Sequence, residues 1–182
     1  MTDRSPMPSD KMSRFLVPQS TMRHLILTLG LALPLSSCGG GSDPAAQTTA
    51  GHSALGSGDH AAALADFEGA LSAIGSDTAH PQYMRATMGA IEANATLDPD
   101  RAVADFKALA AKTEVPDRDY SKVGGWLAAA KNYGQAIDVL DAGMKKFEGS
   151  ETLVKLTEKI KTEAEKAGDS DALAKMRGLG YL

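Results

Sequence analysis

The stretch Ala63-Leu64-Ala65-Asp66-Phe67 (ALADF) returns almost unchanged further along the chain. It recurs as AVADF at residues 102–106, and AIDVL at residues 136–140 keeps its apolar positions. The copies are 39 and 34 residues apart, and the longer separation contains the turn-rich stretch GSDTAHP at residues 75–81. Self-similarity at a period of roughly 20–50 residues predicts an array of similar units packed on one another.

Each copy is preceded by residues that favour the start of a helix. These are Gly58-Asp59, then Asp98-Pro99, then Asn132 with Gln135 three residues later as a capping box. Beyond each copy the apolar residues continue at helical spacing. We therefore expect a helix at each copy.

A partner helix is expected just upstream of each copy, at residues 44–56, 81–95 and 117–130. In each partner helix a small residue precedes the repeated alanine by the same twelve positions: Gly51, Ala90 and Gly124. Such a residue allows two helix backbones to approach closely. The sequence thus predicts three helical hairpins, in an all-α protein.

This pattern of small and bulky positions resembles the tetratricopeptide repeat (TPR) over residues 44–148. The matching positions are Ala63, Ala102 and Ala136 for the family's alanine, Phe67, Phe106 and Leu140 for its large packing residue, and His60 and Tyr133 for its aromatic residue after the turn. Pro99 departs from that last position. The resemblance implies a right-handed helical-hairpin solenoid.

Residues 149–182 are expected to close the array. A predicted capping helix carries apolar residues on one face and Lys and Glu elsewhere; the apolar residues are Leu153, Leu156, Ile160, Ala164 and Ala167. Gly168-Asp169 then predicts a short helix to about Met176, ended by Gly178. The last four residues form a tail.

Residues 1–37 have the features of a secretory signal. Met22-Arg23-His24 is a short basic start, and the uncharged run at residues 25–35 is about half the ~20 residues that a membrane-spanning helix needs. Residues 1–21 are polar and contain three prolines, so they have no place in a signal peptide. Translation from Met12 or Met22 would account for them.

The run ends in Leu35-Ser36-Ser37-Cys38, which resembles the lipobox of bacterial lipoproteins. The resemblance implies that the signal is removed and that Cys38, the only cysteine, carries a lipid anchor. Residues 38–43 would form a glycine-rich tether. Gly39 replaces the aspartate that commonly retains such proteins in the inner membrane, which favours the periplasmic face of the outer membrane.

Composition and motifs exclude several classes of function. From Cys38 onward there are 15 basic and 21 acidic residues, which argues against nucleic acid as a partner. GSGDHA at residues 56–61 has the shape of a dinucleotide loop without a preceding strand. His52, His60 and His80 lack metal-ligand spacing. We therefore expect no cofactor, no metal site and no enzyme, and we place Trp126 in the core rather than at a ligand site.

By the family resemblance, the first helix of each hairpin lines a groove that binds a protein or peptide segment of the cell envelope. The expected groove residues are Thr48, His52, Met84, Thr87, Ile91, Arg118, Ser121 and Gly125. None is Lys or Asn, which disfavours a clamp for a terminal carboxylate. The function expected is a lipid-anchored scaffold or assembly factor; the alternative is an accessory subunit of an envelope enzyme system or a binder of cell-wall saccharides. A groove filled by the chain's own tail is a further alternative.

Overall fold

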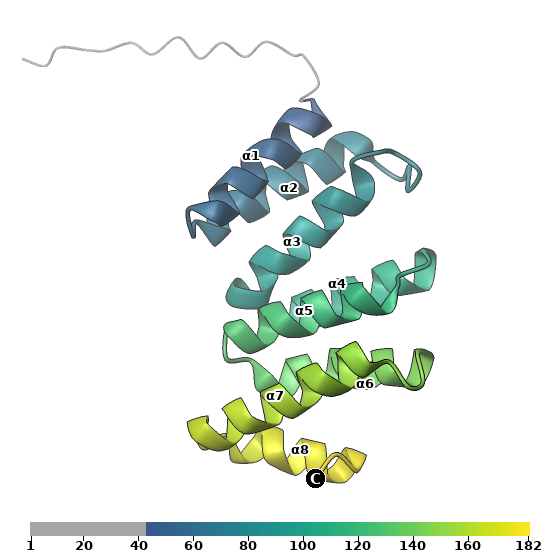
Figure 1. Ribbon diagram of the computed structural model, residues 1–182. Helices are drawn as coiled ribbons and strands as arrows, with labels where there is room; N and C mark the ends of the chain where they lie inside the picture. Colours follow the sequence, from purple (N-terminus) through teal and green to yellow (C-terminus); the bar gives the residue numbers. More distant parts are fainter. Residues whose placement is uncertain (1–42) are drawn as a thin grey trace, which may run out of the picture. The chain divides into compact units, whose positions relative to one another are not determined.

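Eight α-helices make up the part of the chain that the computed structural model describes, residues 43–182 (Figure 1). They are α1 (Pro44–Gly56), α2 (His60–Ile74), α3 (Tyr83–Leu97), α4 (Pro99–Lys112), α5 (Asp117–Ala129), α6 (Tyr133–Lys146), α7 (Glu151–Ala167) and α8 (Ser170–Leu179). No strand occurs among these residues, so the prediction of an all-α protein is confirmed. The predicted signal, Cys38 and all but the last residue of the tether lie outside the described residues.

Successive helices pack as neighbours except α4 and α5, and each odd-numbered helix also packs against the next odd-numbered one. α1 contacts α2, α3 contacts α4 and α5 contacts α6; α3 also touches both α1 and α5, and α5 touches α7. The first helices of the three predicted hairpins therefore form one continuous surface (Figure 1).

Aspartate side chains cap four of the helices, and the sequence predicts helix starts at three of them, Asp59, Asp98 and Asp169. Each accepts a hydrogen bond from a backbone N–H in the first turn: Asp43 from Ala45, Asp59 from Ala62, Asp98 from Arg101 and Asp169 from Ala172. These caps satisfy N–H groups that have no partner within the helix. Pro44 and Pro99 follow two of them at the start of α1 and α4, where proline fits the helix.

The predicted capping box at the start of α6 is wrong. The Asn132 side chain makes no capping bond; its Nδ2 donates to the Ala95 carbonyl at 2.9 Å. Gln135 Nε2 donates to Asp100 Oδ1 at 2.9 Å instead of reaching back to Asn132. Both side chains therefore connect α6 to the end of α3 and the start of α4. Their polar groups bond to these tertiary partners and not to the N-terminus of α6.

Gly178 does not end the last helix. α8 continues to Leu179, and Gly180 takes the left-handed conformation with φ of 83°. The N–H of Tyr181 donates to the Met176 carbonyl at 2.9 Å and that of Gly180 to Arg177 at 3.1 Å. This pair of bonds is a Schellman motif, so the glycine two residues later is the one that stops the helix.

The repeated residues are the centre of the packing. Ala63, Ala102 and Ala136 are fully buried, and the bulky residues four positions later are at most 1% exposed. A Cβ added to Gly51 would lie 2.7 Å from the Phe67 ring, and one added to Gly124 would lie 2.9 Å from Leu140. The constant spacing in the sequence thus corresponds to direct contact between the two helices of a pair.

The buried residues form two unequal clusters that meet at α3. The smaller cluster lies in α1–α3 and contains Phe67 with five alanines. The larger one extends from α3 to α8 and contains most of the large buried side chains. Phe67 is therefore the single large fully buried side chain that holds the first hairpin to the rest.

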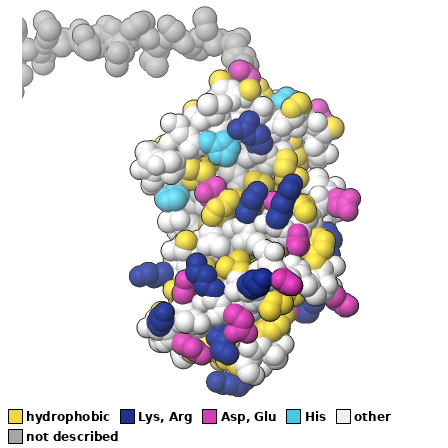
Figure 2. All heavy atoms as spheres, viewed as in Figure 1, with side chains coloured by type: hydrophobic (Ala, Val, Ile, Leu, Met, Phe, Trp, Pro, Cys, Tyr) yellow, Lys and Arg dark blue, Asp and Glu magenta, His cyan; other side chains and the backbone are white. Residues whose placement is uncertain are grey.

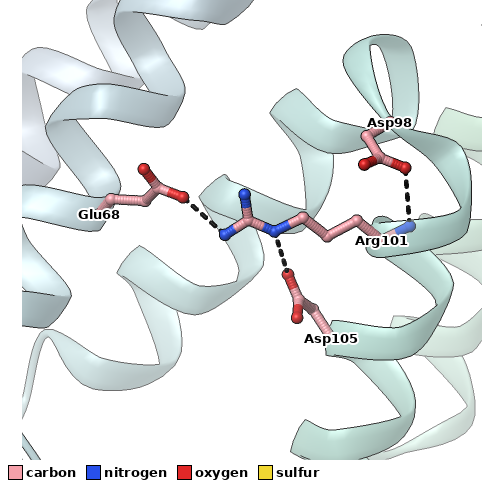
Figure 3. Close-up of polar contacts among 4 residues, drawn as sticks. All are labelled: Glu68, Asp98, Arg101 and Asp105. Atoms are coloured by element: carbon pink, nitrogen blue, oxygen red, sulfur yellow. Dashed lines mark hydrogen bonds and ion pairs between the residues drawn. The ribbon is translucent and has the colours of Figure 1, made fainter.

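An ion-pair network joins α2 to α4 at the surface (Figure 3). Arg101 Nη2 lies 2.6 Å from Glu68 Oε1, and Arg101 Nε lies 3.5 Å from Asp105 Oδ2. All three side chains are 42–48% exposed. Exposed pairs of this kind contribute about 0–1 kcal/mol each, so apolar packing around Phe67 is the stronger link.

Candidate functional site

A groove of about 360 Å³ crosses the surface formed by α1, α3 and α5, and we call it the α1–α3–α5 groove. Its lining residues are His52 from α1; Met84, Arg85, Met88, Gly89 and Glu92 from α3; and Arg118, Asp119, Lys122 and Trp126 from α5. Figure 2 shows Lys and Arg side chains beside hydrophobic and acidic ones over α3 and α5.

Three of the eight groove residues predicted from the sequence line this groove: His52, Met84 and Arg118. Ser121 and Gly125 are half-buried and lie outside the lining.

The other three predicted groove residues face elsewhere. Ile91 is fully buried, and Thr48 is 1% exposed with its hydroxyl donating to the Pro44 carbonyl at 2.7 Å. Thr87 lines a separate pocket between α2, α3 and α4. These three predictions are corrected. Ile91 and Thr48 are buried in the interior, and Thr87 lies at a different surface.

The exposed stripe is shifted from the predicted one by one residue. On α3 it runs through Arg85, Met88 and Glu92, and on α5 through Lys122 and Trp126. One residue turns a helix by about 100°, so the repeat alignment located the right helices but only part of the exposed face, including Met84 and Arg118. The feature of the sequence that marks the exposed face of α3 is the pair of charged residues Arg85 and Glu92, which are seven residues apart. Apolar Ile91 directly precedes Glu92 and lies on a different face.

Trp126 has two roles in the structure. It is half-buried and packs against the larger hydrophobic cluster, as predicted, and it also lines the groove. Trp126 therefore belongs partly to the core and partly to the groove surface.

The groove contains three positively charged side chains, Arg85, Arg118 and Lys122, and two acidic ones, Glu92 and Asp119. Asp119 is 9% exposed, and its Oδ1 lies 3.3 Å from Lys122 Nζ and 4.0 Å from Arg118 Nε. One carboxylate therefore serves two cations. Among residues 43–182 no carboxylate is paired with Arg85, which is exposed on α3.

Two titratable groups of the groove have shifted pKa values. Burial, together with the nearby positive charge of Arg85, lowers the pKa of His52 below its ordinary 6.5. The His52 ring packs edge-on against Phe67, with centroids 5.0 Å apart. Burial raises the pKa of Glu92, while His60 and Lys122 act in the opposite direction. The lowered pKa of His52 favours its neutral ring at neutral pH.

Neither a metal-ligand cluster nor a membrane-spanning helix occurs in residues 43–182. No group of three or more His, Cys, Asp and Glu residues in residues 43–182 could hold a metal ion. His80 Nδ1 accepts a hydrogen bond from the Gln82 N–H at 3.1 Å, so it serves the loop before α3. None of the helices described here combines the length and apolar character needed to cross a bilayer.

Comparison of the chain with protein-family models, with curated proteins and with solved structures finds no match in any of the three. Function therefore has to be argued from the groove and the sequence.

Proposed function

We propose that this protein is a lipid-anchored scaffold of the cell envelope that holds a segment of another protein in the α1–α3–α5 groove. In this proposal α1–α6 form a right-handed solenoid of three TPR-like hairpins, and α7 and α8 cap it. The burial of Ala63, Ala102 and Ala136 at equivalent places supports the repeat.

The groove is the observation that carries the proposal. It extends over three helices, which suits an elongated ligand, and it places Met84, Met88 and Trp126 beside charged side chains. Methionine side chains adapt to different apolar partners, and tryptophan is enriched at the centres of protein interfaces. A surface of this composition favours a protein segment with both apolar and charged residues.

The location follows from the predicted anchor at Cys38. Residues 39–42 separate it from Asp43, and four extended residues reach at most about 14 Å. The groove begins at His52 on α1, so a partner is expected at or close to the membrane surface.

The anchor is tested by expressing the full chain and the variant Cys38→Ala in a bacterial host and fractionating the envelope. We expect the unchanged chain in the membrane fraction and the variant in the soluble fraction, because acyl chains supply the attachment. Equal membrane association of both would contradict the anchor.

The docking function is tested by purifying the full chain from envelopes together with two variants. Met88→Asp places a charge in the groove, and Val154→Asp places the same charge at an exposed apolar position on α7. We expect a reproducible partner that is lost with Met88→Asp and retained with Val154→Asp. Retention by both variants, or no partner with the unchanged chain, argues against the proposal.

A second candidate function is binding of a cell-wall saccharide, and the position of Trp126 favours it. Sugars stack on aromatic rings flanked by polar groups, and Glu92, Asp119 and Arg118 lie in the same groove. Because Trp126 is the only tryptophan, its fluorescence reports on the groove directly. A saturable change on titration with cell-wall saccharide fragments would support this candidate; an unchanged spectrum would count against it.

A further inference from the structure

We propose that the segment bound in the α1–α3–α5 groove is acidic and apolar: it carries at least one carboxylate that meets Arg85 and Arg118, next to apolar side chains that cover Met84, Met88 and Trp126. This inference rests on the docking function proposed above and specifies the chemistry of the partner.

The charge balance of the groove is the first argument. Arg85, Arg118 and Lys122 bring three positive charges, and Asp119 is the one acidic side chain with a cation within pairing distance. Glu92 is half-buried with a raised pKa and does not pair with Arg85. At least one cation therefore remains available to a partner.

The contrast with the rest of the chain is the second argument. Residues 38–182 contain 15 basic and 21 acidic residues, so the surface as a whole is acidic. A local excess of cations on an acidic protein distinguishes one site from its surroundings. Charge complementarity of this kind sets partner specificity more than it sets total affinity.

The apolar side chains exclude a simple anion as the full ligand. Met84, Met88 and half-buried Trp126 line the same groove as the two arginines. A small inorganic anion would leave these side chains in contact with water. A peptide segment with an acidic side chain flanked by Leu, Ile, Met or Phe satisfies both parts of the groove.

The test is selection of peptides from a random 12-residue display library on the full chain purified in detergent. We expect the selected peptides to be enriched in Asp or Glu next to apolar residues. They should lose binding to Met88→Asp. Ionic strength alone is a poor test here, because salt also screens the repulsion between an acidic peptide and the acidic protein.

A charge swap gives the sharper result. Arg85 and Arg118 are both exposed, so the double variant Arg85→Glu with Arg118→Glu should keep the fold. We expect it to bind the selected acidic peptide at least about tenfold more weakly and to select basic peptides instead. The control, Lys107→Glu with Lys166→Glu, changes net charge equally at exposed positions outside the groove and should change affinity less than about threefold.

The outcomes separate this inference from the function on which it rests. Peptides that are neutral or basic but still need Met88 would overturn the acidic partner and leave docking intact. Absence of any peptide whose binding depends on groove residues would overturn both.

Discussion

At the scale of single residues, the closest packing is around the Phe67 ring. Gly51 and Gly89 both face it, and a Cβ added at either would be too close to the ring atoms. Phe67 is fully buried between α1 and α3. Its ring therefore cannot move away from an added methyl group.

We therefore expect Gly89→Ala to lower the free energy of unfolding by about 1–3 kcal/mol through overpacking. Gly125→Ala on α5 is the matched control, because a Cβ there meets no atom within 4 Å. It should raise the free energy of unfolding by about 0.5–1 kcal/mol, since alanine is the better helix former. Urea unfolding of both variants checks this; equal effects would contradict the packing around Phe67.

The second prediction at this scale concerns the pKa of His52. It should titrate below 6.5, chiefly because of burial and further because of Arg85. A lowered pKa favours the neutral ring in the folded state, so the stability it contributes is present above pH 6.5 and is lost as pH falls. In NMR titrations Arg85→Gln should raise the His52 midpoint part of the way toward 6.5. A midpoint that does not change would show that the two side chains are not neighbours in solution.

At the scale of elements, α1, α5, α7 and α8 end with the same pair of backbone hydrogen bonds around a positive-φ residue, whereas the residues that follow α3, α4 and α6 have negative φ. Gly58, Gly168 and Gly180 end their helices in positive-φ conformations, whereas α5 ends on Lys131 with φ of 64°. The N–H of Asn132 donates to the Leu127 carbonyl at 2.9 Å, which is the same bonding pattern.

Lys131→Gly should therefore raise the free energy of unfolding by about 1 kcal/mol, because a side chain in this region costs about 1–2 kcal/mol. Lys131 is exposed, so its removal should cost little in contacts. The measurement is thermal unfolding, with Gly168→Ala as the reverse change that should lower the melting temperature. A destabilised Lys131→Gly variant would contradict the assignment.

The sequence predicts the helices well and the groove only partly, for a physical reason. Capping aspartates and the twelve-residue spacing between a small residue and the repeated alanine are local signals, and they located Asp59, Asp98, Gly51 and Gly124 correctly. The rotation of each helix about its axis depends on contacts with two to four other helices. Ile91 and Thr48 are therefore buried where the repeat alignment placed them in the groove.

At the scale of the whole described unit, the two hydrophobic clusters predict unequal stability along the chain. The cluster of α1–α3 depends on Phe67 among alanines, whereas the cluster of α3–α8 contains many large side chains. Local opening should therefore begin at the first hairpin.

Phe67→Ala should cost about 3–5 kcal/mol and release α1 and α2 while α3–α8 remain folded. Hydrogen exchange resolved by residue should show protection lost in α1 and α2 alone. Phe106→Ala in the larger cluster is the comparison and should lower protection throughout α3–α8. Loss of protection over all eight helices in Phe67→Ala would contradict the division into two clusters.

The central claim is that the anchored protein meets its partner through the α1–α3–α5 groove. Photo-crosslinking in intact cells tests it most directly, with a photoreactive amino acid placed singly at Met84 or Met88 in the groove and at the exposed position Lys107 on α4. We expect a discrete adduct with a protein segment from the two groove positions and none from Lys107. Adducts of equal yield from Lys107, or no adduct from the groove, would contradict it.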